Sequence, residues 1–278
     1  AVDNERVYVA WATPEHLTLR AVDHDGREVW TRDLGAWVGA HGFGTSPIVF
    51  EDLVILHNSQ DAQELDPGQK PGQDYMQAFD RRTGKDVWRT PLPTTRICYS
   101  VPFVLPRDGS PPELICTSTA AGVFSLDLQT GKVNWTTDDA FTMRIVNSPI
   151  AAGGLIFGSN GSGGYSGNYL VAVRPGKSPE KAYTLKNSSK IKVPYVTCFV
   201  AKGDRVFLIY DKGFAACMDA ATGNIRWMER TDGAFSGSPV CIGDHIYCID
   251  EDGVVWVFAA DPEKYRLVAK NPLGEASR

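Results

Sequence analysis

Basic side chains recur in the polar segments that precede the strand-like runs of this sequence. They are His41, Arg96, Arg144 and Lys192. If these segments meet at one edge of the fold, the four side chains form a positive site suited to a carboxylate, a phosphate or an acidic peptide. The alternative is that they are scattered surface charges, or that they pair with nearby acids such as Asp138.

Three more side chains in the polar segments are candidates for ligand contact. Trp37 lies in the same segment as His41, so it is a candidate for an exposed aromatic contact, with packing in the core as the alternative. Asn58 and Asp61 lie in a polar insertion over residues 57–74, where long loops commonly carry binding residues. Their oxygens suit a hard metal ion, but one such pair does not make up a ligand set, and we predict no metal site.

The sequence contains no recognisable catalytic set. No Ser/His/Asp order, metal-ligand cluster or paired-carboxylate site stands out. The six cysteines show neither CxxC spacing nor a neighbouring pair, and we expect buried free thiols in strands. Cys241 and Cys248 flank a short turn and could lie diagonally across a hairpin, a geometry that does not favour a disulfide.

Composition excludes several classes of protein. The chain has 278 residues and a formal charge of −5, which argues against a basic face for nucleic acid. Hydrophobic residues make up 43% and charged residues 22%, as in folded globular proteins. No apolar run approaches the length of a membrane span. The length allows two domains, but all-β folds of this size are often one unit, and we expect a single domain over residues 1–278.

An internal repeat organises most of the chain. Its signature is Asp-x-x-Thr-Gly, followed four residues later by Trp. Close copies lie at Asp80–Trp88, Asp127–Trp135 and Asp219–Trp227, and degenerate copies at Asp23–Trp30, Arg174–Tyr183 and Asp261–Tyr265. The spacing of the tryptophans indicates a period of about 46 residues, in the range of β-propeller blades.

A second marker follows the same period. A small residue and a proline precede a strand-like run at Ser46-Pro47, Ser100–Pro102, Ser148-Pro149, Val193-Pro194 and Ser238-Pro239. The segments between the markers are short β-branched or aromatic runs bounded by turn residues, and no window holds a helical period. Each repeat is therefore predicted to contain four strands.

The residues of the signature explain its structure. Glycine supplies the positive φ that such hairpin turns require, Asp accepts hydrogen bonds from turn amides, and Thr closes the turn with its hydroxyl. The Trp is a large wedge suited to packing against the next repeat. Four-stranded units of this length that cannot bury their faces alone stack as a β-propeller.

With these motifs the chain resembles the pyrroloquinoline-quinone-like β-propeller repeat family, whose repeat is Ala/Ser-Leu-Asp-x-x-Thr-Gly-Lys-x-x-Trp. The resemblance covers nearly the whole chain and implies an all-β propeller of four-stranded antiparallel blades. The family includes quinoprotein alcohol dehydrogenases and non-catalytic members such as the bacterial outer-membrane assembly lipoprotein. The repeat is therefore specific for fold and poorly specific for function.

Six hairpin signatures predict about six blades. The first clear strand covers residues 6–10 and reads as the second strand of its blade, so we expect that blade to lack its inner strand. Members of the family typically have seven or eight blades, and the tail over residues 271–278 ends where another inner strand would follow. This favours a fragment of a larger propeller. A six-bladed propeller closed by another route is the alternative.

The resemblance also bears on function. The family's enzymes hold pyrroloquinoline quinone (PQQ) beside a calcium ion, with an acidic base and typically a vicinal disulfide. No vicinal cysteine pair is present, the calcium ligands and the base match no residue here, and the chain is about half as long as those enzymes. We therefore expect no cofactor. A PQQ-dependent dehydrogenase-like quinoprotein and a sensory ectodomain that binds a ligand are the alternatives.

We predict a non-catalytic scaffold that binds a protein, a peptide or a small anionic ligand at the face where the loops gather. The resemblance implies an exported protein of the bacterial periplasm or cell envelope. Membrane-associated partners fit that setting, and nucleic acid does not fit the negative net charge.

Overall fold

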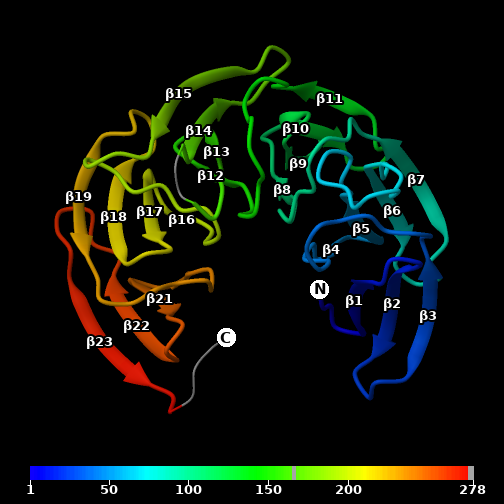
Figure 1. The fold of residues 1–278 in the computed structure, drawn as a ribbon, viewed down its shortest axis with the longest axis horizontal. Coiled ribbons are helices and arrows are strands. Elements are labelled where there is room, and N and C mark those ends of the chain that lie inside the picture. Colours follow the sequence, from blue (N-terminus) through cyan, green and yellow to red (C-terminus); the bar gives the residue numbers. More distant parts are fainter. Residues whose placement is uncertain (165–166, 275–278) are drawn as a thin grey trace. The chain divides into compact units, whose positions relative to one another are not determined.

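The computed structural model describes residues 1–164 and 167–274, and every regular element within these ranges is a β-strand. The strands form six antiparallel sheets in which neighbours in sequence are neighbours in the sheet (Figure 1). The predicted all-β fold class is confirmed. In the part of the chain that is described, no helix is long and apolar enough to cross a membrane. The chain divides into two compact units, residues 1–144 and 145–278, and each is described by itself.

The first unit contains three sheets. The first sheet consists of β1 (Arg6–Ala12), β2 (Leu17–Asp23) and β3 (Glu28–Asp33). The second consists of β4 (Ile48–Phe50), β5 (Leu53–Asn58), β6 (Tyr75–Asp80) and β7 (Asp86–Pro91). The third consists of β8 (Phe103–Leu105), β9 (Glu113–Ser118), β10 (Gly122–Asp127) and β11 (Val133–Thr136).

The second unit repeats this plan. Its first sheet consists of β12 (Ile150–Ala152), β13 (Leu155–Asn160), β14 (Tyr169–Arg174) and β15 (Glu180–Lys186). The next consists of β16 (Val200–Lys202), β17 (Arg205–Tyr210), β18 (Phe214–Asp219) and β19 (Ile225–Arg230). The last consists of β20 (Val240–Ile242), β21 (His245–Ile249), β22 (Val254–Ala259) and β23 (Leu267–Pro272), and the tail from residue 275 lies outside the described residues.

The first sheet has three strands and lacks an inner strand, as predicted, and only a single bridge lies at the inner position. Val2 forms an antiparallel bridge with Val7. The Ala1 ammonium group and carbonyl bond the Tyr8 carbonyl and amide at 2.9 and 2.8 Å. Inner strands elsewhere in the molecule are three residues long, as β12 shows.

Two repeat positions in the second unit differ from the prediction. Pro194 does not open a strand, because the inner strand β16 begins only at Val200. Tyr265 precedes β23, and Ala269 pairs with Val257 at the register position where the other sheets carry Trp or Tyr. Tyr265 instead packs against the Trp227 ring, with the ring centroids 5.7 Å apart. Both shifts come from irregular segments that the repeat pattern does not reveal.

The hairpin turns form as their residue types predict. The Asp80 carboxylate accepts hydrogen bonds from the amide and the hydroxyl of Thr83 at 2.8 and 2.6 Å. Gly84 has a φ of 68°, which a side chain would strain. A Cβ there would also lie 2.7 Å from the Trp30 ring. The turn glycine therefore lets the Trp of the preceding sheet pack closely.

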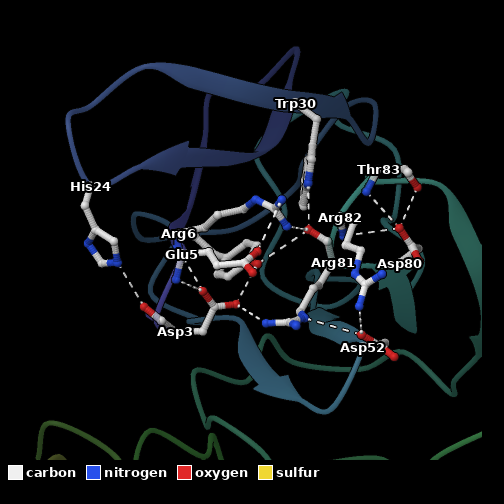
Figure 2. Close-up of polar contacts among 11 residues, drawn as sticks. Asp3, Glu5, Arg6, His24, Trp30, Asp52, Asp80, Arg81, Arg82 and Thr83 are labelled. Carbon is white, nitrogen blue, oxygen red and sulfur yellow. Dashed lines mark hydrogen bonds and ion pairs between the residues drawn. The ribbon is translucent and has the colours of Figure 1, made fainter.

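An aromatic side chain links successive sheets within each unit. In the first unit the Trp30 Nε1 donates to the Arg81 carbonyl at 3.0 Å (Figure 2), and Trp88 donates to the Leu128 carbonyl at 2.9 Å. In the second unit the Tyr183 hydroxyl donates to the Ala220 carbonyl at 2.6 Å. Apolar clusters between the sheets bury the rest of these side chains, so each sheet is stabilised by its neighbour.

The six cysteines are free. Four of them are buried, Cys98, Cys116, Cys217 and Cys248, and the other two are partly exposed. Cys241 pairs across the sheet with Ile246, two residues before Cys248, so the two cysteines lie diagonally across this hairpin, as expected.

Candidate functional site

The candidate site of the first unit lies at the loop end of its sheets, the edge where β5 ends and β6 begins. Three loops meet there, over residues 34–47, 59–74 and 92–102. The Asp61 amide donates to the Val38 carbonyl at 2.9 Å, and the Ala62 amide donates to the Thr95 carbonyl at 2.8 Å. The insertion over residues 59–74 is therefore tied by its backbone to the loops on both sides.

Four side chains form what we call the rim cluster: His41, Glu64, Arg96 and Arg144. Arg144 forms an ion pair with Glu64 through its Nη2 atom. Arg96 Nη2 lies 3.6 Å from the other Glu64 carboxylate oxygen. Two of the four basic candidates from the sequence, Arg96 and Arg144, thus share one carboxylate.

The contact between Arg144 and His41 fixes the tautomer of the histidine. Arg144 Nη1 lies 3.1 Å from His41 Nε2. A guanidinium can only donate, so Nε2 must accept and the ring proton resides on Nδ1. The rim cluster in this arrangement carries two positive charges from arginine and one negative charge from Glu64.

Exposure differs across the rim cluster. The Arg144 side chain is only 12% exposed, whereas Arg96 and Glu64 are each 36% exposed. The Nε atom of Arg144 is buried without a hydrogen-bond partner among the described residues. The cluster thus has one fixed guanidinium and one that remains accessible, which suits recognition of a further acceptor.

The insertion that supplies Glu64 is held by a buried carboxylate. Asp61 is fully buried, and its Oδ1 accepts the amides of Gln63 and Glu64 at 2.9 and 2.8 Å. The Asn58 Oδ1 accepts from the Gln60 side chain at 3.3 Å. The Oδ1 atoms of both residues thus accept hydrogen bonds inside the protein.

Asp74, at the start of β6, is a second buried carboxylate and was missed at the sequence level. It accepts the Gln60 amide at 2.5 Å and the Ser59 hydroxyl at 3.2 Å. Burial, and to a smaller extent the charge of Asp61, raises the pKa of Asp74 to about 8 despite these bonds. Asp74 is therefore largely protonated at neutral pH.

Trp37 is a core residue, so its interpretation as an exposed contact is wrong. It is 7% exposed, and its Nε1 donates to the Ser59 carbonyl at 3.1 Å. Its ring packs edge-on against Phe43 with the centroids 5.9 Å apart. The indole thereby closes the space under the insertion.

Lys192 belongs to the second unit, so it is described apart from the rim cluster. Its ammonium group lies 5.9 Å from the centroid of the Phe214 ring. At the loop end of the same unit Asp211 is buried, and its carboxylate accepts the amides of Tyr195, Val196 and Thr197 at 2.8, 2.8 and 3.2 Å. Asp211 thereby orders the loop that carries Lys192.

Sequence reasoning also missed Glu64, the acceptor at the centre of the rim cluster. The only signal was the length and polarity of the insertion, because nothing local distinguishes Glu64 from the acids on either side of it. Across the described ranges, no group of three or more His, Cys, Asp and Glu side chains is arranged to hold a metal ion.

Solved structures show the same fold. BamB from Moraxella catarrhalis matches 99% of this chain and 73% of its own, with a TM-score of 0.67 and 17% identity. Saccharomyces cerevisiae Sqt1 matches 97% of this chain and 71% of its own, with a TM-score of 0.65 and 10% identity. A europium-containing methanol dehydrogenase matches 93% of this chain and 64% of its own, with a TM-score of 0.57 and 12% identity. At these identities the likeness concerns the fold, which is the β-propeller blade arrangement.

No curated protein matches the sequence. The family model described as outer membrane protein assembly factor BamB matches residues 1–180 and 187–263. This match includes all the close copies of the repeat and spans nearly the whole chain. The chain therefore belongs to this BamB-like family of PQQ-type repeat propellers.

Proposed function

We propose that the protein is a non-catalytic β-propeller scaffold that binds an acidic segment of a protein partner at the rim cluster. The observation that carries this proposal is the convergence of Arg96 and Arg144 on the Glu64 carboxylate, with His41 in contact with Arg144. The cluster keeps an excess of positive charge in a chain whose net charge is −5. Arginine clusters of this kind recognise acidic motifs through paired hydrogen bonds.

The description of the matched family supports a location for this function in the cell envelope. Its model is described as an outer membrane protein assembly factor. We infer an exported protein of the bacterial cell envelope, with a partner that takes part in assembling outer-membrane proteins. That Lys192 contacts the same kind of acidic ligand remains a prediction from the sequence.

The dehydrogenase alternative has less support. A methanol dehydrogenase shares the fold, but at 12% identity this likeness does not extend to chemistry. The Asn58 and Asp61 side chains, which were candidate metal ligands, are engaged with protein groups. The expectation of no cofactor therefore stays a prediction.

Binding of a fluorescein-labelled peptide rich in Glu, followed by fluorescence anisotropy, tests the proposal. Arg96→Gln should weaken binding about tenfold, because Arg96 is the accessible guanidinium, and binding should weaken as salt is added. Arg82→Gln is the matched control, since Arg82 is a 65% exposed arginine of the same unit and pairs with Asp52.

Circular dichroism must show that both variants are folded. An equal loss of affinity in Arg96→Gln and Arg82→Gln would mean general charge attraction and would contradict a specific site. Unchanged binding in Arg96→Gln would contradict the proposal directly.

A further inference from the structure

A cavity of about 350 Å³ lies in the second unit, between the sheet β16–β19 and the sheet β20–β23. It opens at the turn end of the sheets, opposite to the loop end. Its lining includes Lys202, Asp204, Arg205 and Phe207 from one sheet and Ala260 and Pro262 from the next. Its volume is in the range of small-molecule sites.

The first unit shows what occupies the same place between its first two sheets. There the Arg81 guanidinium donates to the Asp3 carboxylate at 2.8 Å (Figure 2). The Tyr8 hydroxyl donates to the same carboxylate at 2.9 Å. Arg6 donates to the Arg81 carbonyl at 3.1 Å. The Arg81 side chain and its partners thus fill the junction.

The register of the strands makes the two junctions comparable. Lys202 pairs with Arg205 as Asp3 pairs with Arg6. The Ala260 amide donates to the Asp244 carbonyl at 2.9 Å, as the Arg81 amide donates to that of Asp52 at 2.8 Å. Three pairs of residues therefore occupy corresponding positions in the two junctions. Lys202 corresponds to Asp3, Phe207 to Tyr8, and Ala260 to Arg81.

The other two junctions within the units are filled by apolar side chains. In the first unit the equivalent of Ala260 is Leu128, which is 3% exposed and packs in one cluster with Leu53. In the second unit it is Ala220, which is fully buried, and a Cβ on Gly153 would lie 3.0 Å from it. Ala260 is only partly buried, as Arg81 is, but its side chain is a single methyl group and does not fill the junction.

The polar groups at the cavity have capacity for an acceptor. Arg205 Nη1 bonds Asp204 and Asp219 at 2.6 and 3.1 Å. Arg205 Nε is buried without a partner among the described residues. Buried donors of this kind are nearly always satisfied. These ion pairs of Arg205 use Nη1, and a guanidinium has further donors that a carboxylate can engage.

Lys202 adds a second cation with an exchangeable partner. Its ammonium group bonds the Gly243 carbonyl at 3.1 Å and pairs with Asp244, whose side chain is 88% exposed. Such an exposed ion pair is weak and can be replaced. Lys202 also stands where the first junction has the acid Asp3, so the charge at this position is inverted.

We propose that this cavity binds a small organic carboxylate with an apolar body. The carboxylate pairs with the Arg205 guanidinium and the Lys202 ammonium group, which both line the cavity. The apolar body lies against Phe207, Ala260 and Pro262, in the space that the Arg81 side chain fills in the first junction. The site lies in the other unit from the rim cluster, so it stands independently of the proposed function.

Isothermal titration calorimetry with butyrate, hexanoate and 3-phenylpropionate tests this assignment. At least hexanoate and 3-phenylpropionate should bind saturably at one site per chain. The neutral amide 3-phenylpropionamide should bind at least tenfold more weakly than 3-phenylpropionate. Arg205→Lys keeps the charge but loses the paired donors, and should weaken binding about tenfold. Absence of saturable binding by all three acids, or equal binding of acid and amide, would overturn the proposal.

Ala260→Leu is the filling variant, because it installs the side chain type found at Leu128. It should abolish binding and leave the melting temperature unchanged or higher, since it fills space with apolar atoms. Ala220→Leu is the matched control at the closed junction, where overpacking should lower the melting temperature. Undiminished binding of 3-phenylpropionate by folded Ala260→Leu would place the ligand elsewhere and reject the cavity.

Discussion

Asp211 in the second unit and Asp74 in the first are both buried carboxylates at the loop end of a sheet, but their surroundings differ. Asp211 follows β17 and accepts three backbone amides from one loop. Asp74 precedes β6, accepts one amide and one hydroxyl, and experiences the charge of Asp61. Burial raises the pKa of both.

This difference shows two ways of ordering a loop. A carboxylate with three amide donors acts as a structural anchor, because removing it leaves three donors unsatisfied. A carboxylate beside another acid is ionised only at a cost, so its loop becomes sensitive to pH. In the first unit the carboxylate beside another acid is Asp74, which lies next to Asp61 beneath the rim cluster. The rim cluster is the proposed binding site.

The largest effect is expected from Asp211→Ala. The free energy of unfolding should fall by about 3 kcal/mol, because three amides lose their acceptor. Urea denaturation measures this loss. Asp211→Asn is the control: it keeps the Oδ1 acceptor for Val196 and Thr197, and should lose about half as much. Equal losses in the two variants would show that charge, and not the hydrogen bonds, matters here.

The next effect concerns Asp74 and pH. Its folded pKa of about 8 exceeds the ordinary 3.8, so the folded state holds a proton that the unfolded state has lost. The resulting stability is complete below pH 4 and is lost as the pH rises through 8. Between pH 6.5 and 8 the free energy of unfolding should fall by about 1.5 kcal/mol, a decline absent in Asp74→Asn. An equally steep decline in that variant would contradict this origin.

A smaller effect of opposite sign is expected from His57. Burial lowers its pKa from 6.5 to about 4, so the unfolded state binds the proton more readily. The stability it contributes is present above pH 6.5 and is lost as the pH falls through 4. In wild type the Asp74 slope offsets this loss. In Asp74→Asn, lowering the pH from 6.5 to 5.5 should therefore cost about 1 kcal/mol.

Adding His57→Gln to Asp74→Asn should remove the acid-side slope, provided the double variant still unfolds cooperatively in urea. A slope that persists would assign the proton uptake to another group.

The smallest effect on stability is expected at the rim cluster. Glu64→Gln removes the carboxylate that Arg96 and Arg144 share, and should change the free energy of unfolding by less than about 1 kcal/mol, because these are partly exposed ion pairs. It should tighten binding of the acidic peptide about threefold, since the peptide no longer competes with Glu64. Weaker binding would show that Glu64 orients the arginines rather than competing.

Local patterns in the sequence predicted the repeat and much of its packing. Asp80, Thr83 and Gly84 define a turn whose hydrogen bonds span a few residues, so their spacing alone specifies the hairpin. Trp88 belongs to the same signature, and its burial against the next sheet follows from its size. Short irregular pieces were not predictable, as the start of β16 at Val200 rather than after Pro194 shows.

The sequence by itself determined the all-β class, the four-stranded repeat and its turns, because each depends on residues near one another in the chain. Only the tertiary structure decided that Glu64 lies between Arg96 and Arg144, and that Asp74 lies under the same loop. It also decided that Ala260 leaves a cavity where Arg81 fills the corresponding space. Such contacts join segments from different loops or sheets, and their distances depend on packing that no local pattern records.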